Sequence, residues 1–482
     1  MYVLLVHAVG NIVFGADLGA INDVSPFVVL ILFPLILLGT WAPIFAFISG
    51  TANVYVFYNL MDKDPSDAAL KKIIKGNLIN NTIILIISYV NMAFFHPSVD
   101  FNGGRQYSIL TGLLETGNLQ FTPDILFYTD AMHIIAMSGF FISAMLYFLW
   151  RNGGFERRRR NVFVMTGVAI LILFVTPVMR EWLLPIFYSE LSAGHYFSAL
   201  ILKTFVGPRQ STFPNVANAL IGAVVGISLA QNSMKQDIKE YTISLALLFL
   251  SIDFLLVIPQ NGIALGDITR NDLPATIYLI NTALQLLVFT LLIVKIEYRD
   301  HETRQKIAKR SVGIRRFGIM ALSIYIFEGI VSIGISKLYI PLWGPDFVLS
   351  ENLVAIILFI VVDVGIWYLL LRLWEKWDFK YSLEWWIVTI VGKLRGRKSS
   401  RLKVNEVLYN PVNIPSEELE ESILPLFPAE TFDKTDLGRL IERFEKILKT
   451  FQRELDHRLH KKIMRKVKDD FKNGSDAKEK ED

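Results

Sequence analysis

Apolar runs long enough to cross a bilayer constrain this chain more than any other feature of its sequence. A transmembrane helix needs about 20 mostly apolar residues, and hydrophobic residues make up 52% of the chain, more than the roughly 45–50% typical of soluble domains. The sequence therefore predicts an all-α fold, a polytopic membrane bundle of about ten transmembrane helices. The runs lie near residues 2–16, 27–61, 77–95, 127–149, 161–178, 214–231, 241–258, 274–296, 317–339 and 353–374.

The first two runs are irregular. Residues 1–16 make a short helix with no basic residue before it, and we expect its basic flank to precede Met1. The second run is too long for one straight span and contains Pro34, Gly39 and Pro43. It predicts a broken helix whose second part begins near Trp41, and broken helices at membrane depth usually line a cavity.

Basic residues are distributed unevenly between the two sets of alternating loops. The loops at 62–76, 150–161, 232–240 and 295–316 carry 19 Lys and Arg, whereas the intervening loops carry 5. Loops rich in Lys and Arg face the cytoplasm. With ten crossings, this places both termini inside a multi-pass protein of the cell membrane.

The composition changes after the last apolar run. Residues 399–482 carry 17 basic and 18 acidic residues and no candidate span, so we expect a cytoplasmic tail after a membrane domain of residues 1–398. Apolar residues recur every three or four positions over about residues 436–472, which predicts an amphipathic helix. Its expected partners are the tail itself, a second copy of the chain, another protein or the membrane surface.

Several classes of chemistry are excluded by composition and motif. The chain has no Cys, which removes disulfides, thiolate nucleophiles and cysteine-bound metals. The sequence shows no zinc-ligand spacing, no phosphate-binding loop and no dinucleotide fingerprint, so we predict no metal site. A net charge of +4 gives no reason to expect nucleic acid as a partner.

Ionisable side chains within apolar runs are costly to bury and therefore mark candidate functional positions. His7 and His133 are candidate general bases, because neutral imidazole accepts a proton near neutral pH. Asp130 lies three residues before His133, on the same helix face, where a carboxylate can orient the ring. An interhelical hydrogen bond is the alternative for each histidine. At membrane depth these ionisable residues are His7, Asp130, His133, Asp253, Glu328 and Asp363.

Four consecutive arginines, Arg157, Arg158, Arg159 and Arg160, follow the fourth apolar run. Guanidinium groups bind phosphate through two hydrogen bonds, so the run is a candidate site for a phosphate-bearing cofactor. A topology determinant lying on lipid head groups is the alternative.

Six short segments follow one another in the order found in a known family. The chain resembles the heparan-alpha-glucosaminide N-acetyltransferase-like family of membrane proteins and, more distantly, the bacterial membrane O-acyltransferases of the acyltransferase-3 type. The resemblance covers about residues 1–394 and leaves the tail unmatched. Its segments are VLLVHAVGN, WAPIFAFISG, TDAMHIIAMS, FPNVANALIGAVVGISLA, FGIMALSIYIFEGI and YSLEWW.

The resemblance implies a transmembrane acyltransferase. Such a protein takes an acyl group, which the resemblance implies is acetyl, from cytoplasmic acyl-CoA to a hydroxyl or amine of an extracytoplasmic glycan or glycolipid. His7 falls on the first-helix histidine that serves these proteins as the base, and His133 falls on their Leu-His position. Glu328 stands where the family pattern often has His. The residues leave two other functions open, a secondary transporter of a small polar solute and a membrane scaffold without catalysis.

Overall fold

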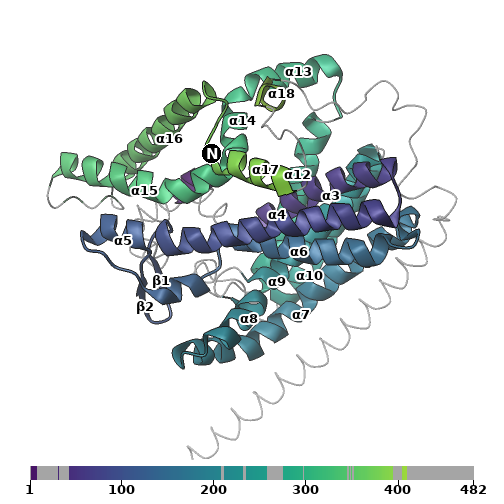
Figure 1. Ribbon diagram of the computed structural model, residues 1–482, viewed down its shortest axis with the longest axis horizontal. Helices are drawn as coiled ribbons and strands as arrows, with labels where there is room; N and C mark the ends of the chain where they lie inside the picture. Colours follow the sequence, from purple (N-terminus) through teal and green to yellow (C-terminus); the bar gives the residue numbers. More distant parts are fainter. Residues whose placement is uncertain are drawn as a thin grey trace, which may run out of the picture. The chain divides into compact units, whose positions relative to one another are not determined.

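A computed structural model describes the chain in sections, and all of them belong to the first of its two units, residues 1–423 (Figure 1). The predicted tail helix at 436–472 and the predicted boundary at 398 lie outside the described residues, as do Pro34 and Gly39 of the predicted helix break. The described residues are 2–7, 31, 43–207, 211–231, 235–257, 275–296, 298–344, 347, 349, 352–394 and 404–409.

The described chain is mostly helical, with one small hairpin in which β1 (Val99–Phe101) pairs antiparallel with β2 (Gly104–Gln106). The helices are α1 (Tyr2–His7), α3 (Pro43–Lys63), α4 (Asp67–Phe94), α5 (Ile109–Thr116), α6 (Ala131–Trp150), α7 (Arg158–Ser192), α8 (Tyr196–Val206), α9 (Thr212–Ala230), α10 (Lys235–Val257), α12 (Ala275–Ile296), α13 (His301–Arg310), α14 (Val312–Ile319), α15 (Ala321–Tyr339), α16 (Leu353–Glu375), α17 (Leu383–Leu394) and α18 (Val404–Tyr409).

Eight helices among the described residues are long and apolar enough to cross a membrane, which agrees with a helical membrane bundle. The predicted span at 241–258 is helix α10, which is not among the eight, and only α1 is described of the predicted first span. The count of ten therefore remains a prediction. Pro43 is the first residue of α3, a position that proline favours because it needs no amide donor.

Helices α3 and α9 pack more closely than any side chain larger than glycine allows. A Cβ atom added at Gly50 would overlap the carbonyl oxygen of Ala219, and one added at Gly222 would overlap that of Phe47. Small residues at such contacts let membrane helices approach and gain dispersion energy without a hydrophobic driving force. This contact holds α9, which is buried along most of its length, at the centre of the bundle.

A second group of elements packs beside α4 and α6. Buried side chains from α1, α14, α16 and α18 form one apolar cluster with the start of α15, including Leu4, Phe317 and Leu408. Another cluster joins α15 and α17 to α4 and α6. Helix α15 therefore lies between α1 on one side and the α4–α6 pair on the other, which positions its polar residues at the junction.

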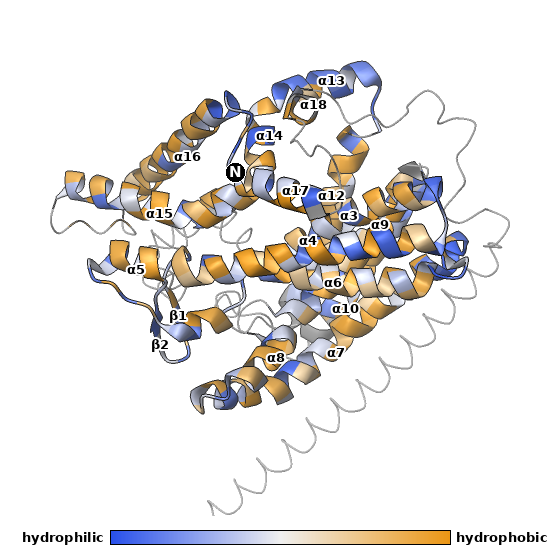
Figure 2. Cartoon of the chain, in the orientation of Figure 1, coloured by the Kyte–Doolittle hydropathy of each residue, from blue (hydrophilic) through white to orange (hydrophobic). Residues whose placement is uncertain are grey.

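Different elements lie at the two ends of the α4–α6 pair, connecting loops at one end and the β-hairpin at the other (Figure 2). At one end the amide of Asn152 donates to the Asp67 carboxylate at 3.0 Å, so the loops that connect α3 to α4 and α6 to α7 lie together. At the other end the hairpin packs on the start of α6, with the Phe101 and Tyr128 ring centroids 6.1 Å apart. Two loops predicted to share the basic side thus lie at one end; we call this the basic end and the other the hairpin end.

Single cysteines in a chain without native cysteine can test the predicted sidedness. Glu156→Cys and Gly104→Cys place exposed thiols at the basic end and at the hairpin end. In intact cells we expect a membrane-impermeant maleimide to label the second variant and to label the first only after lysis, because basic loops stay in the cytoplasm. Equal labelling of both in intact cells would contradict the topology.

The start of α15 is held by a side chain from α17. The amides of Leu322 and Ser323 donate to Glu384 Oε1 at 2.7 and 3.0 Å, and the Ser323 hydroxyl donates to Oε2 at 2.6 Å. The first amides of a helix have no partner within it, so Glu384 acts as a distant N-cap. This bond network fixes the position of α15, which carries Glu328.

Glu384 should make stability depend on pH. Burial raises the pKa of its carboxyl, so the folded chain binds this proton more tightly than the unfolded chain. Its stabilising effect is complete below the unfolded pKa and is lost as pH rises through the folded pKa. We expect Glu384→Gln to remove this slope, seen in unfolding midpoints at about pH 5 and about pH 8.

The matched variant Glu384→Ala removes the acceptor for two amides and should cost about 1–3 kcal/mol at either pH. A Glu384→Gln protein that is as unstable as Glu384→Ala would show that the cap requires the charge. A Glu384→Ala protein of unchanged stability would show that the cap contributes nothing.

Candidate functional site

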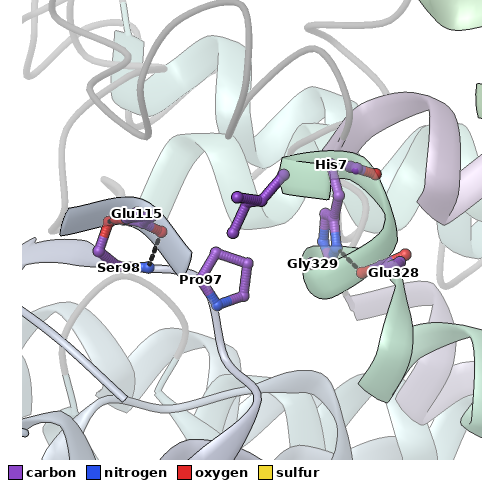
Figure 3. A pocket seen from close by; sticks show the side chains of 8 residues that line it. His7, Pro97, Ser98, Glu115, Glu328 and Gly329 are labelled. Atoms are coloured by element: carbon purple, nitrogen blue, oxygen red, sulfur yellow. Dashed lines mark hydrogen bonds and ion pairs between the residues drawn. The ribbon is translucent and has the colours of Figure 1, made fainter. Parts of the chain in front are cut away.

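A pocket lies between α15, α1 and the chain that follows α4 (Figure 3). It has a volume of about 300 Å³, part of which is open to solvent. Four of its polar side chains form two pairs that face one another across Pro97. The lining residues are His7, Pro97, Ser98, Glu115, Glu328, Gly329, Ser332 and Ile333.

The first pair joins His7 to Glu328. His7 Nδ1 contacts Glu328 Oε1, and the His7 ring lies 5.6 Å from the Tyr325 ring. The Glu328 side chain is only 3% exposed, whereas His7 is 34% exposed. A buried carboxylate that accepts from Nδ1 fixes the ring and its tautomer, which leaves Nε2 as the nitrogen able to take a proton.

The second pair lies on the hairpin-end chain. Ser98 is 1% exposed and contacts Glu115 twice, through its hydroxyl and through its amide, which donates to Glu115 Oε1 at 3.2 Å. Pro97 approaches α15 at Gly329, where an added Cβ would stand 2.8 Å from the Pro97 ring. Glycine at this position therefore allows the two walls of the pocket to close on each other.

Asp130 and His133 are placed differently from the prediction. Asp130 is the N-cap of α6, and its Oδ1 accepts from the His133 backbone amide at 2.7 Å and from the Ser88 hydroxyl at 2.7 Å. The His133 ring is 3% exposed, and neither of its nitrogens has a hydrogen-bond partner. The three-residue spacing thus forms a helix cap, and the carboxylate does not orient the imidazole.

His133 does not line the pocket that holds His7. Tyr325 contacts the His7 ring, and its hydroxyl accepts from the amide of Ala131 at 3.3 Å, in the first turn of the helix that carries His133. The His133 ring instead meets Tyr89, at 6.0 Å between centroids, and the Lys203 ammonium stands 5.0 Å from that same Tyr89 ring. The two histidines therefore have different neighbours.

The four arginines do not converge on one point. Arg160 donates to the Leu149 carbonyl at 2.7 Å, and Arg158 stands over the Tyr58 ring at 5.6 Å. They lie at the basic end, where α6 ends, whereas Asp130 begins α6. Twenty residues of helix separate the ends of α6 by about 30 Å. Arg157 and Arg159, which are exposed, remain available to bind phosphate.

Two further polar groups continue from Glu328 into the bundle. Ser332, one helical turn after Glu328, donates to Asp363 Oδ2 on α16 at 3.1 Å. Asp363 is fully buried, and neither its Oδ1 nor Glu328 Oε2 has a hydrogen-bond partner. Carboxylates of α15 and α16 thus share one polar row that ends at the pocket.

The sequence marks Glu328 as a candidate functional residue but does not indicate that it contacts His7. Glu328 is one of the ionisable residues at membrane depth, and in FGIMALSIYIFEGI it stands where the pattern of the resembled family often has His. Its partner lies 321 residues away, a distance that no helical spacing rule covers. Ser98 and Glu115 carried no signal, because both lie in a stretch predicted only as a loop.

No protein-family model, no curated protein and no solved structure matches this chain. Any assignment of function therefore depends on the chemistry of the pocket and on the segments quoted above.

Proposed function

We propose that this protein is a membrane acyltransferase in which His7 is the general base and Glu328 orients it. The contact between His7 Nδ1 and Glu328 in a partly open pocket carries the proposal. A buried carboxylate behind an imidazole is the arrangement that activates hydroxyl and amine nucleophiles. The order of the six quoted segments adds support, because His7 falls on the base of the family that they resemble.

The proposed reaction moves an acyl group from a thioester to a hydroxyl or an amine. The acceptor oxygen or nitrogen bonds to the carbonyl carbon while its proton passes to His7 Nε2. The carbon–sulfur bond then breaks, and the proton goes from His7 to the departing CoA thiolate. Glu328 stabilises the imidazolium between these steps, which a neutral side chain at its position would not do.

The two ends of α6 suit the two substrates of such a reaction. Acyl-CoA is the proposed donor, with its phosphates at Arg157 and Arg159 on the basic end, and this requires its thioester arm to extend along α6 toward His7. The acceptor is a glycan or glycolipid that approaches the pocket from the hairpin end. In this proposal the basic end is cytoplasmic and the protein lies in the plasma membrane.

Transfer of label tests the proposal directly. The full chain, purified in detergent, is incubated with acetyl-CoA labelled in the acetyl group and with a panel of glycans and glycolipids. We expect labelled acceptor to form with the native chain and to be nearly absent with Glu328→Gln. His195→Ala is the control, because His195 is 63% exposed and pairs with Glu190 away from the pocket.

The polar row through Ser332 and Asp363 supports a second candidate, a proton-coupled transporter. Buried carboxylates on neighbouring helices are typical of proton relays. A transporter would transfer no label in the assay, yet proteoliposomes containing it would accumulate a solute when a pH gradient is applied. A scaffold would do neither, so the two measurements separate the three functions.

A further inference from the structure

The polar side chains described in the lining of the His7 pocket accept hydrogen bonds and have no proton left to donate. The Ser98 hydroxyl donates to Glu115, and the Ser332 hydroxyl donates to Asp363 on α16 at 3.1 Å. A serine hydroxyl carries one proton, so both oxygens present only lone pairs to the pocket. In the proposed arrangement His7 gives its Nδ1 proton to a carboxylate, and its Nε2 also accepts.

The pocket also carries more negative than positive charge. Glu115 and Glu328 both line it, and its described lining contains no Lys or Arg. The Arg105 guanidinium stands 3.8 Å from the Glu115 carboxylate and 3.6 Å from that of Asp100, so two carboxylates share its charge. Such a pocket repels a ligand that carries a carboxylate or a sulfate. It also keeps an amine protonated and therefore non-nucleophilic.

Glu115 lies across Pro97 from His7 (Figure 3). Its side chain is 20% exposed, and Ser98 contacts both of its oxygens, through the amide at 3.2 Å and through the hydroxyl. An ionised carboxylate offers about four lone-pair sites. Glu115 therefore retains sites for a donor on a bound molecule that also reaches His7 in the same pocket.

We propose that Glu115 selects the acyl acceptor by binding a second hydroxyl of an uncharged sugar, while His7 takes the proton from the reacting hydroxyl. This inference rests on the proposed acyl transfer and names the class of sugar. The reaction is unchanged: the oxygen bonds to the carbonyl carbon, the carbon–sulfur bond breaks, and the proton passes through His7 to the CoA thiolate. Glu115 binds the sugar and exchanges no proton.

Four small compounds test this selection with the full chain in detergent. They are methyl glucoside, methyl glucosaminide, methyl glucuronide and 3-hydroxytetrahydropyran, a sugar-like ring with one hydroxyl. We expect kcat/KM for transfer of labelled acetyl to be at least about tenfold higher for methyl glucoside than for the other three, the effect of about 1.4 kcal/mol. The amine, the acid and the single hydroxyl each lack one feature that the pocket requires.

Binding is measured separately from transfer, as the rise in the unfolding midpoint with each compound and without acyl-CoA. Methyl glucoside should give a saturable rise, and so should methyl glucosaminide, because an ammonium donates well to carboxylates. Methyl glucuronide and 3-hydroxytetrahydropyran should give none at the same concentration. This pattern of binding without any transfer of label would reject acyl transfer and retain the assignment of the pocket, so the two proposals can fail separately.

Glu115→Gln and Asp100→Asn form a matched pair, because both carboxylates lie beside Arg105 but only Glu115 lines the pocket. Glu115→Gln should raise the KM of methyl glucoside about tenfold, a change of about 1.4 kcal/mol, and leave the KM of acetyl-CoA unchanged. It should also narrow the preference for methyl glucoside over methyl glucuronide, which a purely structural role would not change. Asp100→Asn should alter none of these quantities.

Two results would overturn the selection by Glu115 while acyl transfer stands. The first is a native chain that transfers acetyl to any of the other three compounds as well as to methyl glucoside. The second is a Glu115→Gln protein with the native preference among the four. Where Glu115→Gln fails to fold, the preference of the native chain decides. If no compound takes label or shifts the midpoint, both proposals are rejected.

Discussion

Replacing His7 with Ala should lower the turnover of acyl transfer by about 10²- to 10⁴-fold, the usual contribution of a general base. The variant loses the nitrogen that takes the acceptor proton and leaves Glu328 buried without its partner. Initial rates with labelled acetyl-CoA, measured at saturating donor, report this loss. The Michaelis constant for the donor should change little, because the proposed phosphate contacts lie at the other end of α6.

Two control variants show whether the loss comes from the base. His133→Ala should retain much more turnover than His7→Ala, since the His133 ring does not line the pocket. His195→Ala should behave like the native chain. A His7→Ala protein with near-native turnover would reject His7 as the base, and a loss confined to His133→Ala would assign the reaction to His133 instead.

Introducing Leu at Gly222 should largely abolish recovery of folded protein. Even a Cβ atom there overlaps the Phe47 carbonyl oxygen, and the obstacle is backbone that cannot rotate away. Helices α3 and α9 would have to separate, and overpacking costs about 1–3 kcal/mol and occasionally more. The measurement is the yield of monodisperse protein in size-exclusion chromatography, together with its unfolding midpoint.

The matched control is Gly167→Leu. Gly167 also lies inside an apolar helix, but its added Cβ would meet nothing within 4 Å. This variant should be recovered as well as the native chain. If both variants are lost equally, replacing any glycine of an apolar helix with Leu lowers recovery, and the close α3–α9 contact is not the cause.

The sequence predicts the long helices of the bundle better than it predicts the short elements and the contacts between helices. Apolar runs locate most of the long helices because hydrophobic length is a local property of the chain, as with α16 against the predicted span at 353–374. The hairpin at 99–106 and helix α5 were missed, because short elements in a polar loop carry no comparable length signal. The distant N-cap by Glu384 depends on how α17 packs, which no spacing within α15 encodes.

The candidate site shows the same limit. His7 and Glu328 could each be selected as costly ionisable groups in apolar runs, yet nothing in the sequence paired them. The pair that spacing did suggest, Asp130 and His133, is close because one caps the helix that carries the other. A three-residue spacing fixes only which backbone groups meet, whereas the direction of a ring depends on the neighbouring helices.

The separation of His7 and Glu328 in the chain has a consequence for biosynthesis. His7 leaves the ribosome 321 residues before Glu328, and at about 5–20 residues per second this delay is on the order of tens of seconds. During that time His7 lacks the carboxylate that it contacts in the folded chain, and α1 lacks the helix α15 on which it packs. A chain arrested before α15 should therefore leave α1 accessible to protease or to a membrane chaperone, and release from arrest should protect it.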